Sequence, residues 1–412
     1  MNNILLKDYL IEITKGTTPT TIGGEFIESG VNFVKAECLN TGRIIDKSSL
    51  SYISPEIHKK LNRSILQEDD LLFSIAGHLG KMAIVRKEDL PANTNQAVAI
   101  LRIDQKKGDV NFLYYYLNST QISNYIRKQC AQSVQPNLNL AQVGQLPIIV
   151  YSLPTQKSIA KVLSDLDAKI ELNNKINREL EAMAKTLYDY WFVQFDFPTP
   201  PSSTSGIVGK PYKSSGGKMV YNEELKREIP EGWEVGTVED YCRIFTGKKD
   251  VNQSLEIGKY KFFSCAPGYK YSDEKLYEGK AILVSGNGSY TGRTIFVDEG
   301  FDLYQRTYAC VNKTETDYLA YIYYSMLRYM SLKINGGTHG SAIPYIVFDD
   351  IAKEIIVINH NLINKFQNIV YPLINKIMNN NKQAVELAKL RDWLLPMLMN
   401  GQVASRASAT AK

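Results

Sequence analysis

Two short segments combine glycines with a following cation, a pattern that could contact a phosphate. The first reads Ser74-Ile-Ala-Gly77-His-Leu-Gly80-Lys81, and the second reads Ser285-Gly-Asn-Gly288-Ser-Tyr-Thr-Gly292-Arg293. Glycine lets the backbone approach a ligand closely, and a lysine or arginine beside it can bind phosphate or the edge of guanine. A tight hairpin whose cation is merely solvated is the alternative interpretation. The candidate contact residues here are His78, Lys81, Asn287, Ser289, Tyr290 and Arg293.

Further polar residues follow each segment along the chain. Gln96 and Gln305 come next, and an amide side chain can make two hydrogen bonds to adenine. A buried structural amide is the alternative for both glutamines. The polar segments 132–137 and 336–345, marked by proline or glycine, lie later in each half. Their candidate contact residues are Gln135, Asn137, His339 and Tyr345.

The motifs of a DNA-modifying enzyme are missing from the sequence. A methyltransferase would need an Asn-Pro-Pro-Tyr type motif, and no Asn-Pro-Pro occurs. Residues 286–292 depart from the spacing of a dinucleotide loop and lead into β-branched residues rather than a helix. The pairs Glu224/Lys226 and Glu278/Lys280 fit only half of a nuclease motif, and the four histidines are too dispersed for a metal site or a triad. We expect no catalytic residue and no metal here; a solitary nuclease or methyltransferase is the enzyme-class alternative.

The elements that must position these segments occur twice in the chain. Residues 169–175 (KIELNNK) match residues 376–382 (KIMNNNK) at an offset of 207, and residues 147–150 match 354–357 at the same offset. Further collinear pairs are Pro136 with Pro344, Gln96 with Gln305, and Lys81 with Arg293. A collinear series at a slowly drifting offset indicates an internal duplication.

Each copy begins with a part rich in predicted strands. Apolar runs of strand length bounded by turn residues occur at 70–74, 82–85 and 97–101, and again at 281–285, 294–297 and 307–311. Tyrosine-rich stretches at 112–127 and 318–332 are predicted to be helical. Between the copies, proline, serine and glycine give residues 198–232 the composition of a linker.

Each copy ends in a helix with a coiled-coil stripe, because apolar residues recur in alternating steps of three and four. Asn173 and Asn380 fall at equivalent stripe positions, where a buried amide costs stability but fixes the register. Pro372 is expected to kink or start the second helix. The core of a simple αα-hairpin is the alternative interpretation of the stripe. The predicted seam residues are Ile159, Leu163, Leu166, Ile170, Asn173, Leu180, Leu187, Phe366, Val370, Leu373, Ile377, Asn380, Leu387 and Leu394.

These patterns predict an α+β protein with two globular domains related by internal duplication and separated by two long antiparallel coiled-coil helices. The predicted boundaries are 1–152 and 233–358 for the globular domains, 153–197 and 359–403 for the helices, 198–232 for the linker and 404–412 for a tail.

The composition indicates an ordinary globular protein. The 412 residues are 44% apolar and 22% charged, enough for two or three domains. No apolar run approaches the roughly 20 residues of a membrane span, and charge interrupts the N-terminus too early for a signal peptide. The five scattered cysteines predict buried thiols in a reducing compartment, so we expect a cytoplasmic protein. The net charge of +5 leaves neither globular half strongly basic, so any nucleic-acid surface must be a local patch.

The order globular domain, helix, globular domain, helix resembles the specificity subunit of a type I restriction-modification enzyme. The resemblance rests on residues 153–177 and 187–197, which are similar to the central conserved region of that family, and on residues 390–403, which are similar to its distal one. Ile229-Pro-Glu-Gly-Trp233 is similar to the entry to a target recognition domain. No such motif precedes Lys7-Asp-Tyr9, so we expect residues 1–12 to pack differently from 233–245.

The resemblance implies a non-catalytic subunit in which each globular half reads one part of a bipartite double-stranded DNA site. It implies that the helices set the spacer between the half-sites and dock two modification subunits, which restriction subunits join. S-adenosylmethionine, ATP and magnesium would be used by those partners, none would be bound by this chain, and no membrane is implied. The alternatives are the specificity subunit of a related system with one fused modification-nuclease partner, and a coiled-coil scaffold without nucleic acid.

Overall fold

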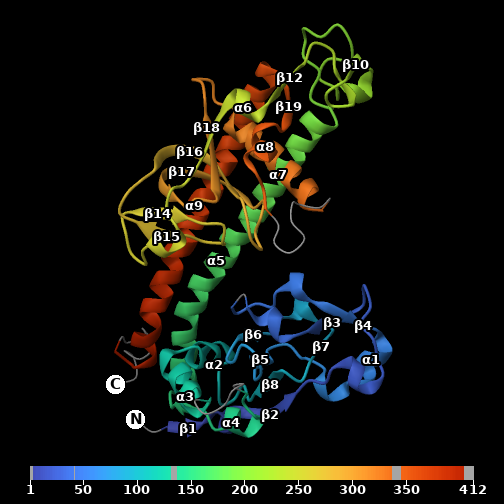
Figure 1. Cartoon of the computed structure of the whole chain (residues 1–412). Coiled ribbons are helices and arrows are strands. Elements are labelled where there is room, and N and C mark those ends of the chain that lie inside the picture. The colour runs from blue at the N-terminus through green and yellow to red at the C-terminus, as the bar shows by residue number, and fades with distance from the viewer. Residues whose placement is uncertain (1–2, 41, 131–136, 336–344, 403–412) are drawn as a thin grey trace. The chain divides into compact units, whose positions relative to one another are not determined.

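The computed structural model describes residues 3–40, 42–130, 137–335 and 345–402 (Figure 1). The chain divides into two compact units, Met1–Leu172 with Gln383–Lys412 and Asn173–Lys382. Each unit contains one globular domain of helices and strands together with part of two long paired helices. The predicted α+β class, with a duplicated domain and an antiparallel helix pair, is confirmed.

The first unit is built on a sheet buried on both faces. Its strands, in spatial order, are β2 (Leu10–Lys15), β8 (Val98–Ile103), β5 (Leu71–Ser74) and β6 (Met82–Ile84). Successive side chains of a strand point to opposite faces. Leu71 and Phe73 therefore pack with the helix α2 (Val110–Leu117), while Leu72 packs into a separate apolar cluster. That cluster lies toward a smaller sheet of β4 (Ser51–Ile53), β3 (Val31–Val34) and β7 (Ala92–Thr94).

The second unit repeats this plan with a larger sheet. Its strands, in spatial order, are β13 (Cys242–Thr246), β18 (Thr307–Asn312), β16 (Tyr277–Ser285), β17 (Thr294–Leu303), β14 (Tyr260–Phe263) and β15 (Lys270–Ser272). On β16, Ile282 and Val284 pack with the helix α7 (Leu319–Asn335), whereas Ala281 and Leu283 face a second apolar cluster. The central strands thus bury both faces, which explains their continuous apolar runs.

The duplication extends to the start of each domain. The strand β1 (Asn3–Leu5) pairs with β9 (Pro147–Ile149), and β12 (Glu234–Thr237) pairs in the same antiparallel way with β19 (Ile355–Ile358). A short helical turn then leads into β2 or β13 in both copies. The expectation that residues 1–12 pack differently from 233–245 is therefore wrong. Pairing with the strand before the long helix holds this segment, and it does not require the Pro-Glu-Gly-Trp motif.

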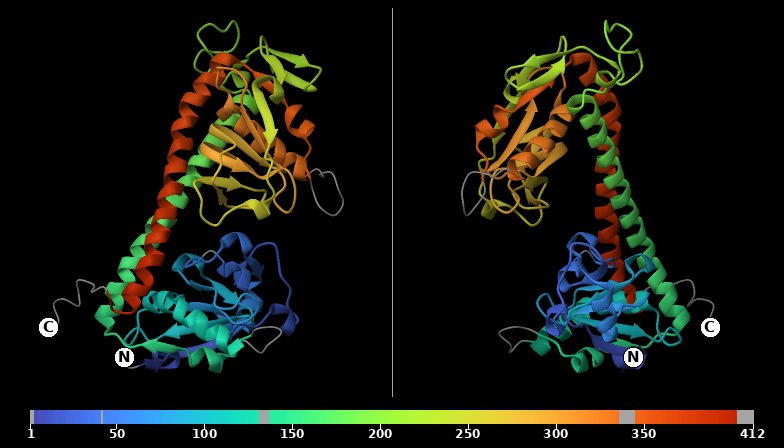
Figure 2. Two further views of the ribbon diagram at one scale, coloured as in Figure 1. Left: turned by 60° about the vertical axis from the view of Figure 1, so that its left-hand side comes forward. Right: turned by 90° about the vertical axis from the view of Figure 1, so that its right-hand side faces the viewer.

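The two long helices lie side by side in both views of Figure 2. The helix α5 (Leu153–Tyr188) continues as a π-helical turn to Val193, and α9 spans His360–Met399. Residue numbers rise along α5 while those of its contacts fall along α9, so the pair is antiparallel. The contacts that show this are Asp167 with Arg391, Asn177 with Asn380, and Trp191 with Phe366.

Two helix predictions differ from the structure. The tyrosine-rich stretch 112–127 forms two helices, α2 and α3 (Thr120–Cys130). The first ends at Leu117 and is capped by Asn118, whose side chain donates back to the carbonyl of Tyr114 at 3.0 Å. Pro372 does not start the second long helix, which begins at His360. Pro372 lies on its exposed side, where the carbonyl that loses its partner can bind water.

The predicted linker at 198–232 is folded on itself. The strands β10 (Met219–Asn222) and β11 (Arg227–Pro230) form a hairpin. The ring of Phe197 stacks on Tyr212 and Trp233, with ring centroids 4.8 and 5.2 Å apart. The proline, serine and glycine content of the segment predicted a flexible linker. The contacts among the rings of Phe197, Tyr212 and Trp233 instead hold the segment in a folded conformation.

Candidate nucleic-acid interface

The two glycine-rich segments form equivalent turns. The first joins β5 to β6: the amide of Ser74 donates to the carbonyl of Lys81 at 2.8 Å, and the amide of Gly80 donates to Ser74 at 3.0 Å. The second joins β16 to β17: the amide of Ser285 donates to Arg293 at 2.9 Å, and that of Gly292 donates to Ser285 at 2.8 Å. The same hydrogen bonds close both turns, so Lys81 and Arg293 occupy equivalent positions.

The glycines of these turns are required by backbone conformation. Gly77 and Gly288 have φ angles of 74° and 84°, in the left-handed region that favours glycine. A Cβ atom added to either glycine would meet no atom within 4 Å. The backbone is therefore open on this side, where a ligand can approach it.

Two further segments meet each turn through its backbone. The amide of Ile75 donates to Ala97 at 2.8 Å, and its carbonyl accepts from Leu138 at 2.9 Å. Gly286 makes the same pair of bonds, donating to Arg306 at 2.9 Å and accepting from Ile346 at 2.8 Å. Candidate segments far apart in sequence are thus brought together. We call residues 74–81, 95–97 and 137–138 the first loop cluster, and residues 285–293, 304–307 and 345–346 the second loop cluster.

The candidate residues of the first loop cluster are exposed: His78, Lys81, Gln96 and Asn137. The backbone amide of Lys81 donates to the Ser74 hydroxyl at 3.0 Å, but its side-chain ammonium forms no hydrogen bond or ion pair with the residues that the structure describes. The side-chain oxygen of Gln96 accepts a hydrogen bond from Thr18, so the amide nitrogen is oriented by a neighbouring loop. Gln135 lies outside the described residues.

In the second loop cluster Ser289, Tyr290, Gln305 and Tyr345 are exposed, while Asn287 and Arg293 are half-buried. The guanidinium of Arg293 donates to the carbonyl of Ala266 at 3.1 Å, and burial lowers its pKa from the usual high value. The amide of Gln305 donates to Asp250 at 3.3 Å. Arg293 is therefore held in place, in contrast to Lys81. His339 lies outside the described residues.

The structure adds cations that the sequence analysis missed. Lys15 ends β2 and pairs with Ala99, at the end of the sheet that carries the first loop cluster. Lys248 follows β13 at the corresponding end of the second sheet, and Arg306 lies within the second loop cluster. All three are exposed. These exposed cations give the sheet ends that carry the two loop clusters a local positive charge.

The sequence contains a signal for the segments that carry Lys15 and Lys248. Thr14-Lys-Gly16 and Thr246-Gly247-Lys share a threonine and a glycine at the end of equivalent strands. A Cβ atom at Gly16 would lie 1.9 Å from the carbonyl oxygen of Thr94, and one at Gly247 would lie 1.9 Å from that of Leu303. Only glycine permits this close approach of the backbone.

The sequence model of one family matches most of the chain. That family, described as type I restriction modification DNA specificity domain, matches residues 6–182 and 230–358. The chain belongs to this family. The prediction of a type I specificity subunit is confirmed.

Individual relatives agree with this assignment. The type I restriction enzyme MjaIX specificity subunit of Methanocaldococcus jannaschii is 28% identical, over 95% of this chain and 91% of the relative. The HindI specificity subunit of Haemophilus influenzae is 25% identical, over 71% of this chain and 77% of the relative. The crystal structure of a type I restriction-modification S subunit from M. genitalium shares the fold: the TM-score is 0.60 at 15% identity, covering 96% of this chain and 95% of that one.

In this type I specificity subunit, α5 and α9 pack against each other along the predicted coiled-coil stripe. Every predicted seam residue is buried or half-buried. Asn380 donates to Asn177 at 2.8 Å, and Asn177 donates to Asn381 at 2.7 Å, so buried amides satisfy one another across the pair. Asn173 is also buried, with 1% of its surface exposed. Polar pairing of this kind favours a single register.

Residues 3–40, 42–130, 137–335 and 345–402 offer neither a metal-binding cluster nor a membrane-spanning helix. No group of three or more histidine, cysteine, aspartate or glutamate residues is placed there to hold a metal ion. None of the described helices is long and apolar enough to cross a membrane. Cys38, Cys242 and Cys310 are buried free thiols, and Cys265 is half-buried.

Proposed function

We propose that this type I specificity subunit reads double-stranded DNA through its two loop clusters, each contacting one part of a bipartite site. The observation that carries this proposal is that equivalent scaffolds present different side chains. Where the first turn has His78 and Lys81, the second has Ser289, Tyr290 and Arg293. Base pairs are distinguished by the donors and acceptors that meet them, so the two clusters would read different half-sites.

The helix pair is proposed to set the spacer and to dock two modification subunits, which restriction subunits would join. Several large apolar side chains on α5 and α9 are exposed, including Met183 at 59% and Trp393 at 60%. Exposed apolar side chains on a helix surface favour a protein partner. The duplicated chain offers two similar surfaces, which suits two copies of one partner.

Catalysis is assigned to the partners. S-adenosylmethionine, ATP and magnesium would be bound by the modification and restriction subunits, and this chain would bind none of them. The buried free thiols suit a reducing, cytoplasmic setting. The purified chain, incubated with these cofactors and duplex DNA, should neither methylate nor cleave the DNA; robust activity without partners would contradict this assignment.

The half-site assignment can be tested by methylome sequencing of cells that carry the chain and its modification partner. Replacing Gly77–Leu79 with the corresponding Gly288–Thr291 segment should alter one half-site and leave the other unchanged. The reciprocal replacement should alter only the other half-site. A replacement that changes both half-sites, or neither while the protein remains active, would contradict the proposal.

A further inference from the structure

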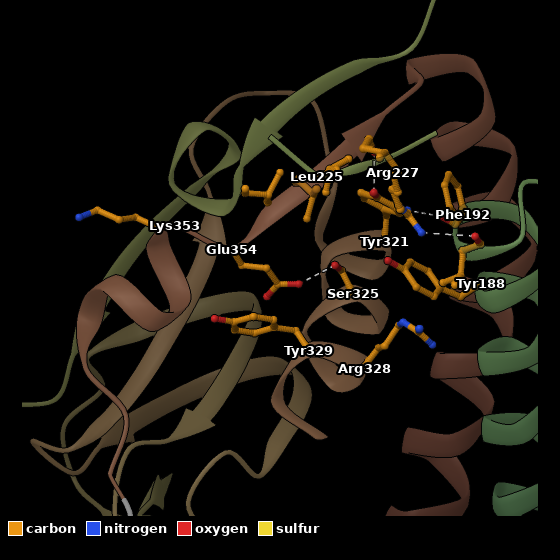
Figure 3. A pocket seen from close by; sticks show the side chains of 14 residues that line it. Tyr188, Phe192, Leu225, Arg227, Tyr321, Ser325, Arg328, Tyr329, Lys353 and Glu354 are labelled. Atoms are coloured by element: carbon orange, nitrogen blue, oxygen red, sulfur yellow. Dashed lines mark hydrogen bonds between the residues drawn. The ribbon is translucent and has the colours of Figure 1, made fainter. Parts of the chain in front are cut away.

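The second unit contains a pocket of about 380 Å³ outside its loop cluster. Its wall is formed by the end of α5 and the following turn, by β11, by α7 and by the segment leading into β19 (Figure 3). The polar side chains in this wall include Tyr188, Arg227, Ser325, Arg328 and Glu354.

Glu354 is the unusual member of this wall. Only 5% of its surface is exposed. One carboxylate oxygen, Oε1, accepts a hydrogen bond from the Ser325 hydroxyl at 2.7 Å, whereas Oε2 is buried with no hydrogen-bond partner among the described residues. Burial raises the pKa of this carboxyl to about 8. A buried oxygen without a donor is costly, so the carboxyl lacks a partner that it could accommodate.

The fold itself does not require a carboxyl at this position. The amide of Leu6 donates to the carbonyl of Leu146 at 2.9 Å, and the equivalent amide of Val238 donates to that of Glu354 at 3.1 Å. These bonds align Glu354 with Leu146, one residue from the match suggested by the sequence. Leu146 lies in the apolar core of the first domain. The polar position is therefore specific to the second domain.

The hydrogen-bond donor to Glu354 is specific to the second domain as well. The helix α2, which corresponds to α7 in the first domain, contains no serine, and its residues other than Asn111 are buried apolar or aromatic side chains. Tyr116 belongs to the apolar core of the first domain, with 1% of its surface exposed. Both members of the Glu354–Ser325 pair thus replace large core side chains, which opens space for a ligand.

The arginines of the wall do not neutralise Glu354. The guanidinium of Arg227 donates to the carbonyls of Phe192 and Val193, both at 3.4 Å, and lies over the ring of Phe195. Figure 3 shows these bonds on the side of the pocket away from Glu354. Burial lowers the pKa of Arg227, which has no carboxylate partner among the described residues.

The remaining cations of the wall are engaged elsewhere. Arg328 forms an ion pair with Asp189 at 3.5 Å. Lys353 pairs with Asp349 at 2.5 Å, and its side chain points away from the pocket in Figure 3. The pocket therefore has an unpaired carboxyl in one part of its wall and guanidinium groups in another.

We propose that this pocket binds an amino-acid-like ligand, whose ammonium or guanidinium group lies at Glu354 and whose carbonyl or carboxylate lies at Arg227 and Arg328. A cation would supply both the donor and the charge that the buried carboxyl lacks. A guanidinium is suited to a carboxylate or carbonyl at the other end. The ligand has two possible sources, a basic residue of a partner subunit or a free small molecule.

Isothermal titration of the full chain tests this assignment with three probes of similar length. The probe 5-aminopentanoate carries both groups, pentylamine carries only the ammonium, and pentanoate carries only the carboxylate. We expect 5-aminopentanoate to bind most tightly, pentylamine more weakly, and pentanoate not at all. Glu354→Gln should weaken binding of the first probe by at least about tenfold, because the amide, unlike the carboxyl, cannot lose a proton and become an anion when the ammonium binds.

Two variants provide controls for the titration. Glu223→Gln, a change at an exposed carboxyl outside the pocket, should leave the affinity unchanged. Glu354→Leu introduces the side chain found at the equivalent position of the first domain and should fold normally while losing the probe. Absence of binding by both ammonium probes to the unmodified chain, or equal binding to Glu354→Gln, overturns the proposal.

Assembly with the modification subunits then distinguishes the two sources. If the cation is a basic residue of a partner, Glu354→Gln weakens assembly and excess 5-aminopentanoate competes with the partner. If the ligand is a free molecule, assembly is unchanged by either. Only the first of these outcomes, in which the cation belongs to a modification subunit, rests on the proposed function. In both cases the methylated half-sites stay as in the unmodified chain, so failure of the pocket and failure of DNA reading are distinguishable.

Discussion

At the residue scale, the two equivalent cations of the loop clusters differ in how they are held. The side chain of Lys81 is exposed and forms no hydrogen bond or ion pair with the described residues, whereas that of Arg293 is half-buried and donates to the carbonyl of Ala266. A lysine is a mobile point charge, while an oriented guanidinium presents a planar set of donors. Lys81 therefore suits a phosphate, and Arg293 suits the guanine edge.

This difference predicts different phenotypes for Lys81→Ala and Arg293→Ala in the assembled modification complex. Lys81→Ala should weaken binding to all sequences alike and make the salt slope shallower by about one. Arg293→Ala should cost roughly 1–3 kcal/mol of discrimination at one base pair. Binding measured over a salt series on the cognate duplex and on single-base variants separates the two effects.

Matched controls follow the neighbouring strands that pair with β5 and β16, at the sheet ends opposite the loop clusters. Lys106 and Lys313 are exposed and follow β8 and β18, away from the loop clusters. Lys106→Ala and Lys313→Ala should leave binding nearly unchanged. If both loop variants behaved like these controls, the cations would be solvated hairpin residues without DNA contact.

Glu354 predicts a pH dependence of stability at the same scale. Its pKa rises from the ordinary 4.5 to about 8 on folding, because burial disfavours the charged carboxylate. The folded state therefore keeps a proton that the unfolded state releases. The free energy of unfolding should fall as the pH rises from 4.5 towards 8, by up to about 1.4 kcal/mol per pH unit, and then level off.

Chemical denaturation across this pH range measures the effect. Glu354→Gln should flatten the pH dependence, since the amide does not titrate, whereas Glu223→Gln should preserve it. Tyr188 and Tyr321, whose pKa values burial also raises, stay neutral throughout. Identical pH profiles for the unmodified chain and Glu354→Gln would show that the carboxyl is not held protonated.

At the element scale, the paired helices combine an apolar seam with a buried amide pair. Asn177 and Asn380 are 6% and 4% exposed and bond to each other across the pair. Removing either amide takes away the hydrogen bond that the other makes inside the seam, although Asn177 keeps its bond to Asn381, and the loss of a buried hydrogen bond is costly. The pair therefore favours the one register in which these two residues meet.

Single and double substitutions of the amide pair should not be additive. Asn177→Leu or Asn380→Leu alone should destabilise the protein by about 1–3 kcal/mol, because the remaining buried amide loses the hydrogen bond between the two. The double variant should recover much of this loss, since two leucines fit an apolar seam. Denaturation midpoints of the four proteins give the coupling energy.

The exposed neighbour Asn379 supplies the control for this cycle, and Asn379→Ala should change stability by less than about 0.5 kcal/mol. Additive losses in the double variant would mean that the amides contribute independently and do not specify the register.

At the scale of the whole molecule, both long helices pass along the chain from one unit to the other. The helix α5 has 36 residues and would be about 54 Å long at a rise of ~1.5 Å per residue. Half-sites one DNA turn apart are separated by roughly 34 Å. A helix pair of this length is sufficient to set the spacer of a bipartite site.

Lengthening both helices should therefore lengthen the spacer. Four residues inserted between Leu172 and Asn173, and four between Lys382 and Gln383, add about 6 Å while rotating each seam only slightly. At ~3.4 Å per base pair, the unspecified gap should grow by one or two base pairs with the same half-sites on either side. Methylome sequencing reads the gap directly; an unchanged gap with full activity would exclude the helices as the spacer.

The sequence by itself determined the duplication, three central strands of each domain and the stripe of the helices. These features depend on local periodicity, which a chain displays before it folds. The glycines of the two turns could also be recognised from the sequence, because a left-handed backbone conformation favours glycine at that position.

Only the tertiary structure decided which distant segments lie together. Asn137 and Tyr345 reach the turns through backbone bonds of Leu138 and Ile346, and backbone bonds carry no side-chain signature. The burial of Glu354 was equally invisible, since its position follows from a strand pairing that the sequence alignment placed one residue away. Long-range pairing and burial depend on the surroundings of a residue as well as its type, so they emerge only when the chain is packed.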